Sequence, residues 1–289
     1  MWLIFAMLSA VFAGVTAVLA KVGIKNVRSN LATAVRCIVV LIFSWLMAFI
    51  TAKRGELMAV SPRTLVFLVL SGLATGASWL CYFRALQLGD VNRVTPVDKF
   101  SVVLTLVLAA AFLGEPMSAW KWVAVALIAV GTYIMIEKKP GEEGRAGKNW
   151  FIYACGSMVF ASLTSILGKV GISGIDSNLG TAIRTVVVLI MAWVVVFAGG
   201  EQSGLRTIDR RSMVFILLSG ITTGASWLCY YRALQIGRAG YVVAVDKLSV
   251  LVTIALPAIV LKEKLSRRGG LGLAVLVLGT LLLVAGDYI

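Results

Sequence analysis

The chain has 289 residues, of which 60% are hydrophobic and only 14% are charged, a composition that excludes an ordinary soluble protein. Lysine and arginine outnumber aspartate and glutamate by 27 to 13, and most of these bases stand in short segments between apolar runs. Anionic lipid headgroups are the expected partners of such bases, so nucleic-acid binding is set aside. Because the chain contains no histidine and its four cysteines lie within apolar runs, we expect no metal site and no cofactor.

Ten segments are long and apolar enough to cross a bilayer, which requires about 20 residues each. The polar stretch at residues 138–149, halfway along the chain, has the composition of a linker. The sequence therefore predicts an all-α integral membrane protein with ten transmembrane helices. The segments are expected at residues 2–22, 30–51, 63–86, 93–113, 118–137, 149–169, 178–199, 211–234, 240–261 and 266–287.

The two halves of the sequence are copies of each other. A shift of 148 residues lays the first half on the second without a gap, and residues 71–105 and 219–253 are then identical at 22 of 35 positions. Because each copy holds an odd number of helices, the second copy must enter the membrane from the opposite side. We therefore expect two inverted five-helix repeats, residues 1–137 and 150–289, in the geometry that alternating-access carriers use.

Three motifs recur in both copies. The first helix ends in AKVGI or GKVGI, the second opens with TAVR or TAIR, and the third carries GASWLCYFRALQLG or its near copy. With these motifs the chain resembles the EamA domain of the drug/metabolite transporter superfamily over essentially its whole length. The resemblance implies secondary transport of small metabolites, with the fourth and ninth helices along a central cavity. The motifs are specific to the fold and give little information about the substrate.

The distribution of bases bears on orientation. More of them stand on the side of the linker, so the positive-inside rule places the linker in the cytoplasm and both termini outside. Ten-helix relatives are generally drawn with both termini inside, so the orientation stays open. The expected location is the cytoplasmic membrane of a bacterium or archaeon, with the bilayer as partner and the chain as a monomer or homodimer.

Two adjacent pairs of charges, Asp98–Lys99 and Asp246–Lys247, lie inside the predicted fourth and ninth helices. A charge at that depth is costly unless it is paired or hydrated, so both pairs are functional candidates. We expect Lys99 and Lys247 to face the substrate, with the aspartates holding them or carrying a coupling proton. The alternative is a pair of interhelical salt bridges, for example between Asp98 and Arg36.

Further candidates lie in the second, third, seventh and eighth helices. Arg36 and Arg184 stand about two turns into the second and seventh helices, where a structural role and substrate contact are equally open. The third and eighth helices carry hydroxyl and aromatic side chains that either wall a cavity or lie near the membrane surface. These side chains are Ser78, Trp79 and Tyr82, and their repeat equivalents Ser226, Trp227 and Tyr230.

The excess of bases within the spans favours a substrate with a carboxylate or phosphate group. The leading hypothesis is a secondary carrier of a small anionic or zwitterionic metabolite, coupled to protons or to exchange. One alternative is an exporter of drugs or other cations, although the first helix lacks the acid that the small multidrug branch uses. Another is a channel or lipid scramblase, which would show flux without saturation. Without histidine or a sizeable loop, an enzyme is not expected.

Overall fold

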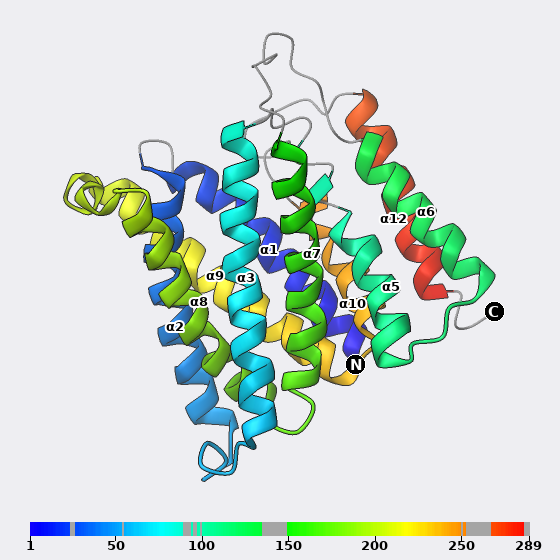
Figure 1. The fold of residues 1–289 in the computed structure, drawn as a ribbon, viewed down its shortest axis with the longest axis horizontal. Coiled ribbons are helices and arrows are strands. Elements are labelled where there is room, and N and C mark those ends of the chain that lie inside the picture. Colours follow the sequence, from blue (N-terminus) through cyan, green and yellow to red (C-terminus); the bar gives the residue numbers. More distant parts are fainter. Residues whose placement is uncertain are drawn as a thin grey trace.

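The computed structural model describes residues 1–23, 27–53, 55–88, 94, 97–98, 100–134, 149–249, 251–252 and 267–285. Every regular element in this part of the chain is a helix (Figure 1). Their bounds lie close to those of the predicted segments, and α5 and α10 cover parts of the predicted fourth and ninth helices. The elements are α1 (Trp2–Gly23), α2 (Ser29–Thr51), α3 (Pro62–Leu88), α5 (Ser101–Leu113), α6 (Ala119–Ile134), α7 (Trp150–Gly171), α8 (Ser177–Ala198), the 3-10 helix η1 (Gln202–Thr207), α9 (Arg210–Ile236), α10 (Ala239–Asp246) and α12 (Arg267–Ala285).

The described helices have the dimensions of a membrane protein. Seven are long and apolar enough to span a bilayer, namely α1, α2, α3, α7, α8, α9 and α12, and α5 and α6 are shorter apolar helices. Large apolar side chains face outwards, with Phe49 77% exposed and Phe112 74% exposed. Such a surface needs a cover of lipid. The protein is therefore a multi-pass membrane protein. The predicted count of ten helices and the predicted linker at residues 138–149 stay predictions, because they depend on residues that the structure does not describe.

Aspartate side chains cap the starts of two helices. The Asp176 carboxylate caps α8 by accepting hydrogen bonds from the backbone N–H groups of Asn178 and Leu179. Asp209 caps α9 in the same way through Ser212 N–H. The two caps account for the residues at which α8 and α9 begin.

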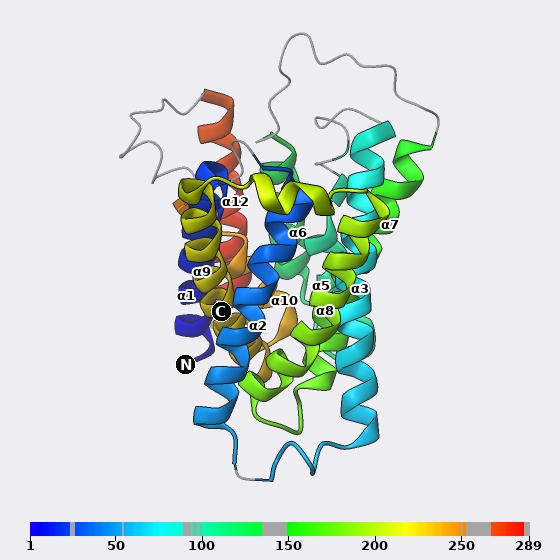
Figure 2. The same cartoon turned by 90° about the vertical axis from the view of Figure 1, so that its left-hand side faces the viewer.

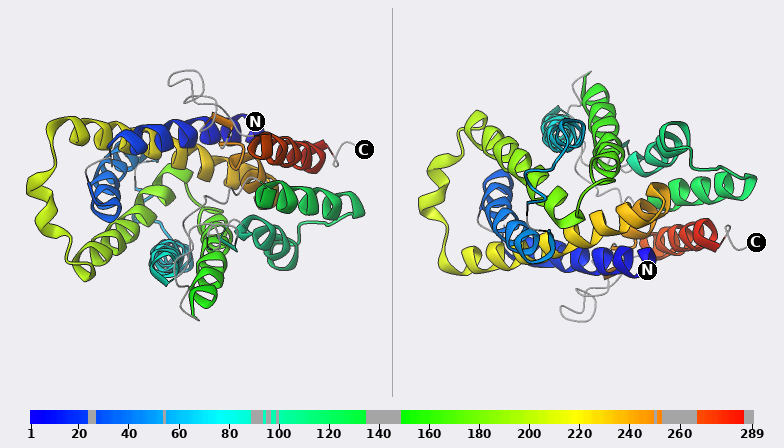
Figure 3. Two further views of the ribbon diagram at one scale, coloured as in Figure 1. Left: turned by 90° about the horizontal axis from the view of Figure 1, so that it is seen from above. Right: turned by 90° about the horizontal axis from the view of Figure 1, so that it is seen from below.

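The two halves of the chain are packed into each other. Helix α1 lies along α9, α3 lies along α7, and α2 packs beside α8 (Figures 1 and 3). Helices α6 and α12 form a separate pair at one side of the molecule (Figure 3). Any cavity between α1, α2 and α9 is therefore built from both halves of the sequence.

Helices α2 and α8, which correspond under the 148-residue shift, run in opposite directions (Figure 2). In Figure 2, α2 runs from the upper end of the molecule to the lower end, whereas α8 runs upwards and is joined to α9 by η1 across the upper end. Arg36 and Arg184, about two turns into α2 and α8, therefore lie toward opposite ends of the bundle.

Glycines bring equivalent helix pairs equally close. A Cβ atom built on Gly72 of α3 would lie 2.7 Å from the Cβ of Val187 on α8. One built on Gly220 of α9 would lie 2.6 Å from the Cβ of Val39 on α2. Gly72 and Gly220 are 148 residues apart, as are Val39 and Val187, so the repeat of the sequence is also a repeat of backbone contacts.

Candidate functional site

The guanidinium group of Arg184 is held inside the protein between α8, α3 and α9. Its Nε donates to Ser71 Oγ at 3.0 Å and its Nη2 donates to Thr75 Oγ1 at 2.5 Å. The group also lies over the rings of Trp227 and Tyr231, with Cζ 5.0 and 4.7 Å from the ring centroids. Only 2% of Arg184 is exposed, and its buried Nη1 has no hydrogen-bond partner in the described part of the chain. Arg184 is thus docked against the protein, and the two N–H donors of its Nη1 are left without an acceptor in the described part of the chain.

Arg36, the repeat equivalent of Arg184, lies instead at the wall of a cavity of about 310 Å³. Its Nε is buried and finds no acceptor among the described residues. We call this space the Arg36 cavity; α1, α2, α3 and α9 all contribute to it. Its lining residues are Ala13, Thr16, Thr33, Arg36, Cys37, Trp79, Thr223, Ser226 and Trp227.

The Arg36 cavity brings together a cation, two indole rings and several hydroxyl groups. Four side chains predicted from the sequence line it: Arg36, Trp79, Ser226 and Trp227. A single guanidinium can bind a carboxylate or phosphate through two parallel N–H donors, and the hydroxyls and rings can orient the remainder of a small ligand. The arrangement therefore suits a small organic anion.

Asp98 is bound by a serine from the other half of the chain. Ser157 on α7 donates a 2.6 Å hydrogen bond to Asp98 Oδ1, and Ser78 on α3 lies 3.3 Å from Ser157 Oγ. Ser78 also donates to the backbone carbonyl of Ser157 at 3.2 Å. These contacts join α3, α7 and the segment at residues 97–98 in one polar cluster.

The same cluster occurs at Asp246. Ser9 on α1 donates a 2.7 Å hydrogen bond to Asp246 Oδ1. Ser226 on α9 lies 3.3 Å from Ser9 Oγ and donates to the Ser9 backbone carbonyl at 3.1 Å. Sequence reasoning missed Ser9 and Ser157, both fully buried. The 148-residue shift, which superposes one serine on the other inside apolar helices, was the available signal.

The two predicted tyrosines lie away from the Arg36 cavity. Tyr230 Oη is 2.8 Å from Ser165 Oγ on α7, and the Tyr230 ring packs edge-on against Tyr231 at 5.3 Å. Tyr82 packs against the small apolar cluster that contains Ala85. Ser78 belongs to the Asp98 cluster. Whether any of these three predicted residues contacts a substrate stays a prediction.

The predicted lysines are placed differently from the arginines. Lys247 follows directly after α10, is partly buried, and is not among the residues that line the Arg36 cavity. Lys99 lies outside the described residues. The interpretation of the two lysines as substrate ligands therefore stays a prediction, whereas Arg36 lines a cavity.

A second charged cluster, which sequence reasoning missed, lies at the start of α10. The Glu115 carboxylate accepts hydrogen bonds from the backbone N–H groups of Ala239 at 2.5 Å and Gly240 at 3.1 Å. Lys169, at the end of α7, approaches Glu115 to 3.7 Å and donates a hydrogen bond to the carbonyl of Gly237. Glu115 thereby ties the turn after α5 to α7 and to the positive end of the α10 dipole. Lys169 is thus bound by protein groups at the end of α7.

Lys121 is another buried base, 4% exposed in α6. Its Nζ donates to the carbonyl of Pro116 at 2.7 Å and lies 5.3 Å from the centroid of the Tyr241 ring. A cation between a carbonyl and an aromatic face is well satisfied. Lys121 therefore has a structural role in fixing α6 against α10.

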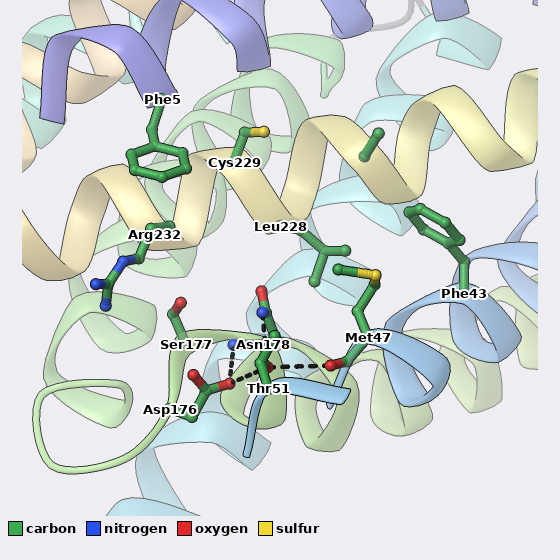
Figure 4. Close-up of a pocket in the computed structure, with 11 residues that line it drawn as sticks. Phe5, Phe43, Met47, Thr51, Asp176, Ser177, Asn178, Leu228, Cys229 and Arg232 are labelled. Atoms are coloured by element: carbon green, nitrogen blue, oxygen red, sulfur yellow. Dashed lines mark hydrogen bonds between the residues drawn. The ribbon is translucent and has the colours of Figure 1, made fainter. Parts of the chain in front are cut away.

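A larger cavity of about 400 Å³ lies between α1, α2, α8 and α9 (Figure 4). Most of its wall is apolar, including Phe5 and Phe43, and Asp176 lies at one side. Oδ1 of Asp176 accepts from two N–H groups of α8 and from Thr51 Oγ1 at 3.1 Å. This carboxylate already caps α8, so the polar groups that the cavity offers a ligand are exposed Arg232 and the side chains of Thr51, Ser177 and Asn178.

A family profile decides the class of the protein. The profile of the EamA-like transporter family matches residues 1–137 and matches again at residues 148–285. The chain belongs to the EamA-like transporter family. This membership, together with the apolar helices, indicates a membrane transporter rather than an enzyme.

Two individual proteins are similar to this EamA-like transporter. A protein of a Sinorhizobium species, described as "Uncharacterized transporter in cobO 3'region", is 47% identical over 137 residues. The match spans 46% of this chain and 95% of the relative, so the relative corresponds to about one half of this chain. A crystal structure with 15% sequence identity superposes with a TM-score of 0.76, over 98% of this chain and 97% of the other, and shares its fold.

Proposed function

We propose that this EamA-like protein is a secondary transporter that moves a small anionic or zwitterionic metabolite across the cytoplasmic membrane of a bacterium or archaeon. The Arg36 cavity carries the proposal, since it offers one incompletely satisfied guanidinium, two indole walls and several hydroxyls. A guanidinium in such a place favours a ligand with a carboxylate or phosphate group.

The mechanism we propose is alternating access between two inverted repeats of five helices each. The opposite directions of α2 and α8 and the matching contacts of Gly72 and Gly220 support this topology. Because α1 packs on α9 and α3 on α7, a shift of one repeat against the other would change both ends of the bundle together.

The two serine–aspartate pairs are the proposed sites of coupling to protons. Each aspartate accepts a hydrogen bond from the opposite half of the chain, Asp98 from Ser157 and Asp246 from Ser9. Protonation would turn one carboxylate oxygen into a hydroxyl and weaken a charge-assisted bond between the halves. Transport by Asp98→Asn and Asp246→Asn variants with unchanged pH dependence would exclude this role and leave exchange as the coupling.

Thermal stabilisation of the purified protein by ligands tests the substrate class, because a ligand that binds only the folded state raises its stability. The panel holds amino acids, sugar phosphates, nucleotides and lipophilic cations. We expect stabilisation by anionic compounds in the wild type and in Arg206→Gln, and its loss in Arg36→Gln. Arg206 is an exposed base in η1 and serves as the matched control.

Two results would contradict the proposal. Stabilisation by lipophilic cations alone, indifferent to Arg36, would favour an exporter of cationic compounds. In proteoliposomes, tracer flux that neither saturates nor exchanges would favour a channel or scramblase.

A further inference from the structure

Arg184 and Arg36 occupy equivalent positions in the two copies of the sequence, but their guanidinium groups are bound differently. The docking pair of Arg184 is Ser71 and Thr75 on α3. Shifting these residues by 148 gives Ser219 and Thr223 on α9, so Arg36 has a docking pair of the same two residue types available. The residue types of the docking pair therefore do not explain why the two arginines are bound differently.

The second docking pair is present but is not used. The hydroxyl of Ser219 donates to the carbonyl of Ile216 at 2.7 Å, and that of Thr223 donates to the carbonyl of Ser219 at 2.6 Å. Arg36 retains a buried Nε without a partner among the described residues and lines its cavity together with Thr223.

The backbone around both arginines is equivalent. A Cβ built on Gly72 would lie 3.1 Å from the carbonyl oxygen of Arg184, and one built on Gly220 would lie 3.2 Å from that of Arg36. The approach of α3 to α8 thus matches that of α9 to α2 within about 0.1 Å. Exchanging the docked and undocked states requires rotation of side chains and movement of the surrounding helices, but no new helix interface.

The helices that cover the two sites differ. On the docked side, Ser71 donates to the carbonyl of Thr164 on α7 at 2.8 Å, and Thr75 lies 3.3 Å from Thr164 Oγ1. On the other side, the equivalent residue of α1, Thr16, instead bonds Thr222 at 2.7 Å. Helix α7 therefore closes the Arg184 site through the docking pair itself, whereas α1 leaves a cavity at Arg36.

We propose that Arg184 is a second anion-binding site, equivalent to Arg36 and occluded in this conformation because its Nε and Nη2 donate to the hydroxyls of Ser71 and Thr75. In the opposite conformation Arg36 docks on Ser219 and Thr223, and Arg184 is released to a cavity of its own. The ligand would be the same carboxylate or phosphate that the Arg36 cavity takes, so this inference rests on the proposed function. Trp227 separates the two sites, because its ring lies beside Arg184 and also lines the Arg36 cavity.

Alkylation of two equivalent reporter cysteines tests the exchange. Ala13 lines the Arg36 cavity, and its repeat equivalent Ala161 lies on α7, about one turn before Thr164. With the four native cysteines replaced, Ala13→Cys or Ala161→Cys is introduced, and its rate of reaction with a maleimide is measured in purified protein. We expect Ala13→Cys to react faster than Ala161→Cys in the otherwise unchanged chain.

Removal of each docking pair should move the ratio of the two rates in opposite directions. Ser71→Ala with Thr75→Ala should lower the Ala13 to Ala161 ratio by about tenfold, since hydrogen bonds to a charged donor are lost from the observed conformation. Ser219→Ala with Thr223→Ala should raise it. Shifts in the same direction, or an unchanged ratio, would overturn the inference.

Two further measurements separate this inference from the proposed function. Protection of Ala161→Cys by acetate or inorganic phosphate, present in the Ser71→Ala/Thr75→Ala background and lost with Arg184→Lys, would support a second anion site. Absence of protection there, while anions still stabilise the wild type through Arg36, would overturn the second site and leave the proposed function standing. If no anion stabilises the wild type, the proposed function fails and the second anion site fails with it. Variants are compared only where their thermal unfolding remains cooperative.

Discussion

Replacing Gly72 with alanine is expected to push α3 away from α8 and to loosen Arg184. The new Cβ would lie 2.7 Å from Val187 Cβ, whereas ordinary contact begins at 3.4 Å, so the helices must separate by about 0.7 Å, the difference between these distances. A separation of that size would stretch the 2.5 Å hydrogen bond between Arg184 and Thr75 toward the limit of a normal bond. Overpacking of this kind costs about 1–3 kcal/mol, or roughly 2–12 °C in Tm at about 2–4 °C per kcal/mol.

The assay is thermal unfolding of purified protein in detergent. Gly174→Ala is the matched control, because a Cβ at Gly174 meets no atom within 4 Å, and its Tm should equal that of the wild type. Gly220→Ala should lose as much stability as Gly72→Ala, since its Cβ would lie 2.6 Å from Val39 Cβ. Wild-type stability in Gly72→Ala would refute the close approach of α3 to α8.

Three further predictions concern single polar contacts. Ser157→Ala should cost about 1.5–3 kcal/mol at neutral pH, because Asp98 loses a hydrogen bond to its charged carboxylate; an unchanged Tm would show that this bond is absent. Glu115→Ala should cost about 1 kcal/mol, as loss of a helix cap does, whereas Glu115→Gln, which keeps an acceptor, should cost less; equal Tm values for the two variants would contradict the capping role. Backbone N–H groups, chiefly that of Asp176, hold the pKa of Glu56 below its ordinary value of 4.5. Stability from Glu56 is therefore present above that value and is lost as the pH falls through the folded pKa, so the small Tm deficit of Glu56→Gln should shrink as the pH falls below 4.5; a deficit independent of pH would argue against it.

The positions of the helices could be predicted from the sequence, because bilayer thickness sets the length of an apolar span. The predicted segments at residues 30–51 and 178–199 agree with α2 and α8 to within one residue at either end. The repeat was equally accessible, since the 148-residue shift needs no gap. It already paired Arg36 with Arg184.

Only the tertiary structure decided which helices meet and which polar groups find partners. Apolar helices in a bilayer face either lipid or each other at similar cost, so hydropathy does not encode which face of α1 turns toward α9. For that reason the sequence could not show that Ser9 reaches Asp246, or that Lys169 binds Glu115 and not lipid headgroups.

Arg36 and Arg184 show most clearly which features the sequence could not determine. The sequence by itself determined that Arg36 and Arg184 are equivalent, because it places them 148 residues apart in matching segments. It could not determine that one is docked on two hydroxyls and the other lines a cavity, since both arginines have a serine and a threonine at the equivalent docking positions. That asymmetry depends on how α1 and α7 sit over the two sites, and only the packing of the whole bundle decides it.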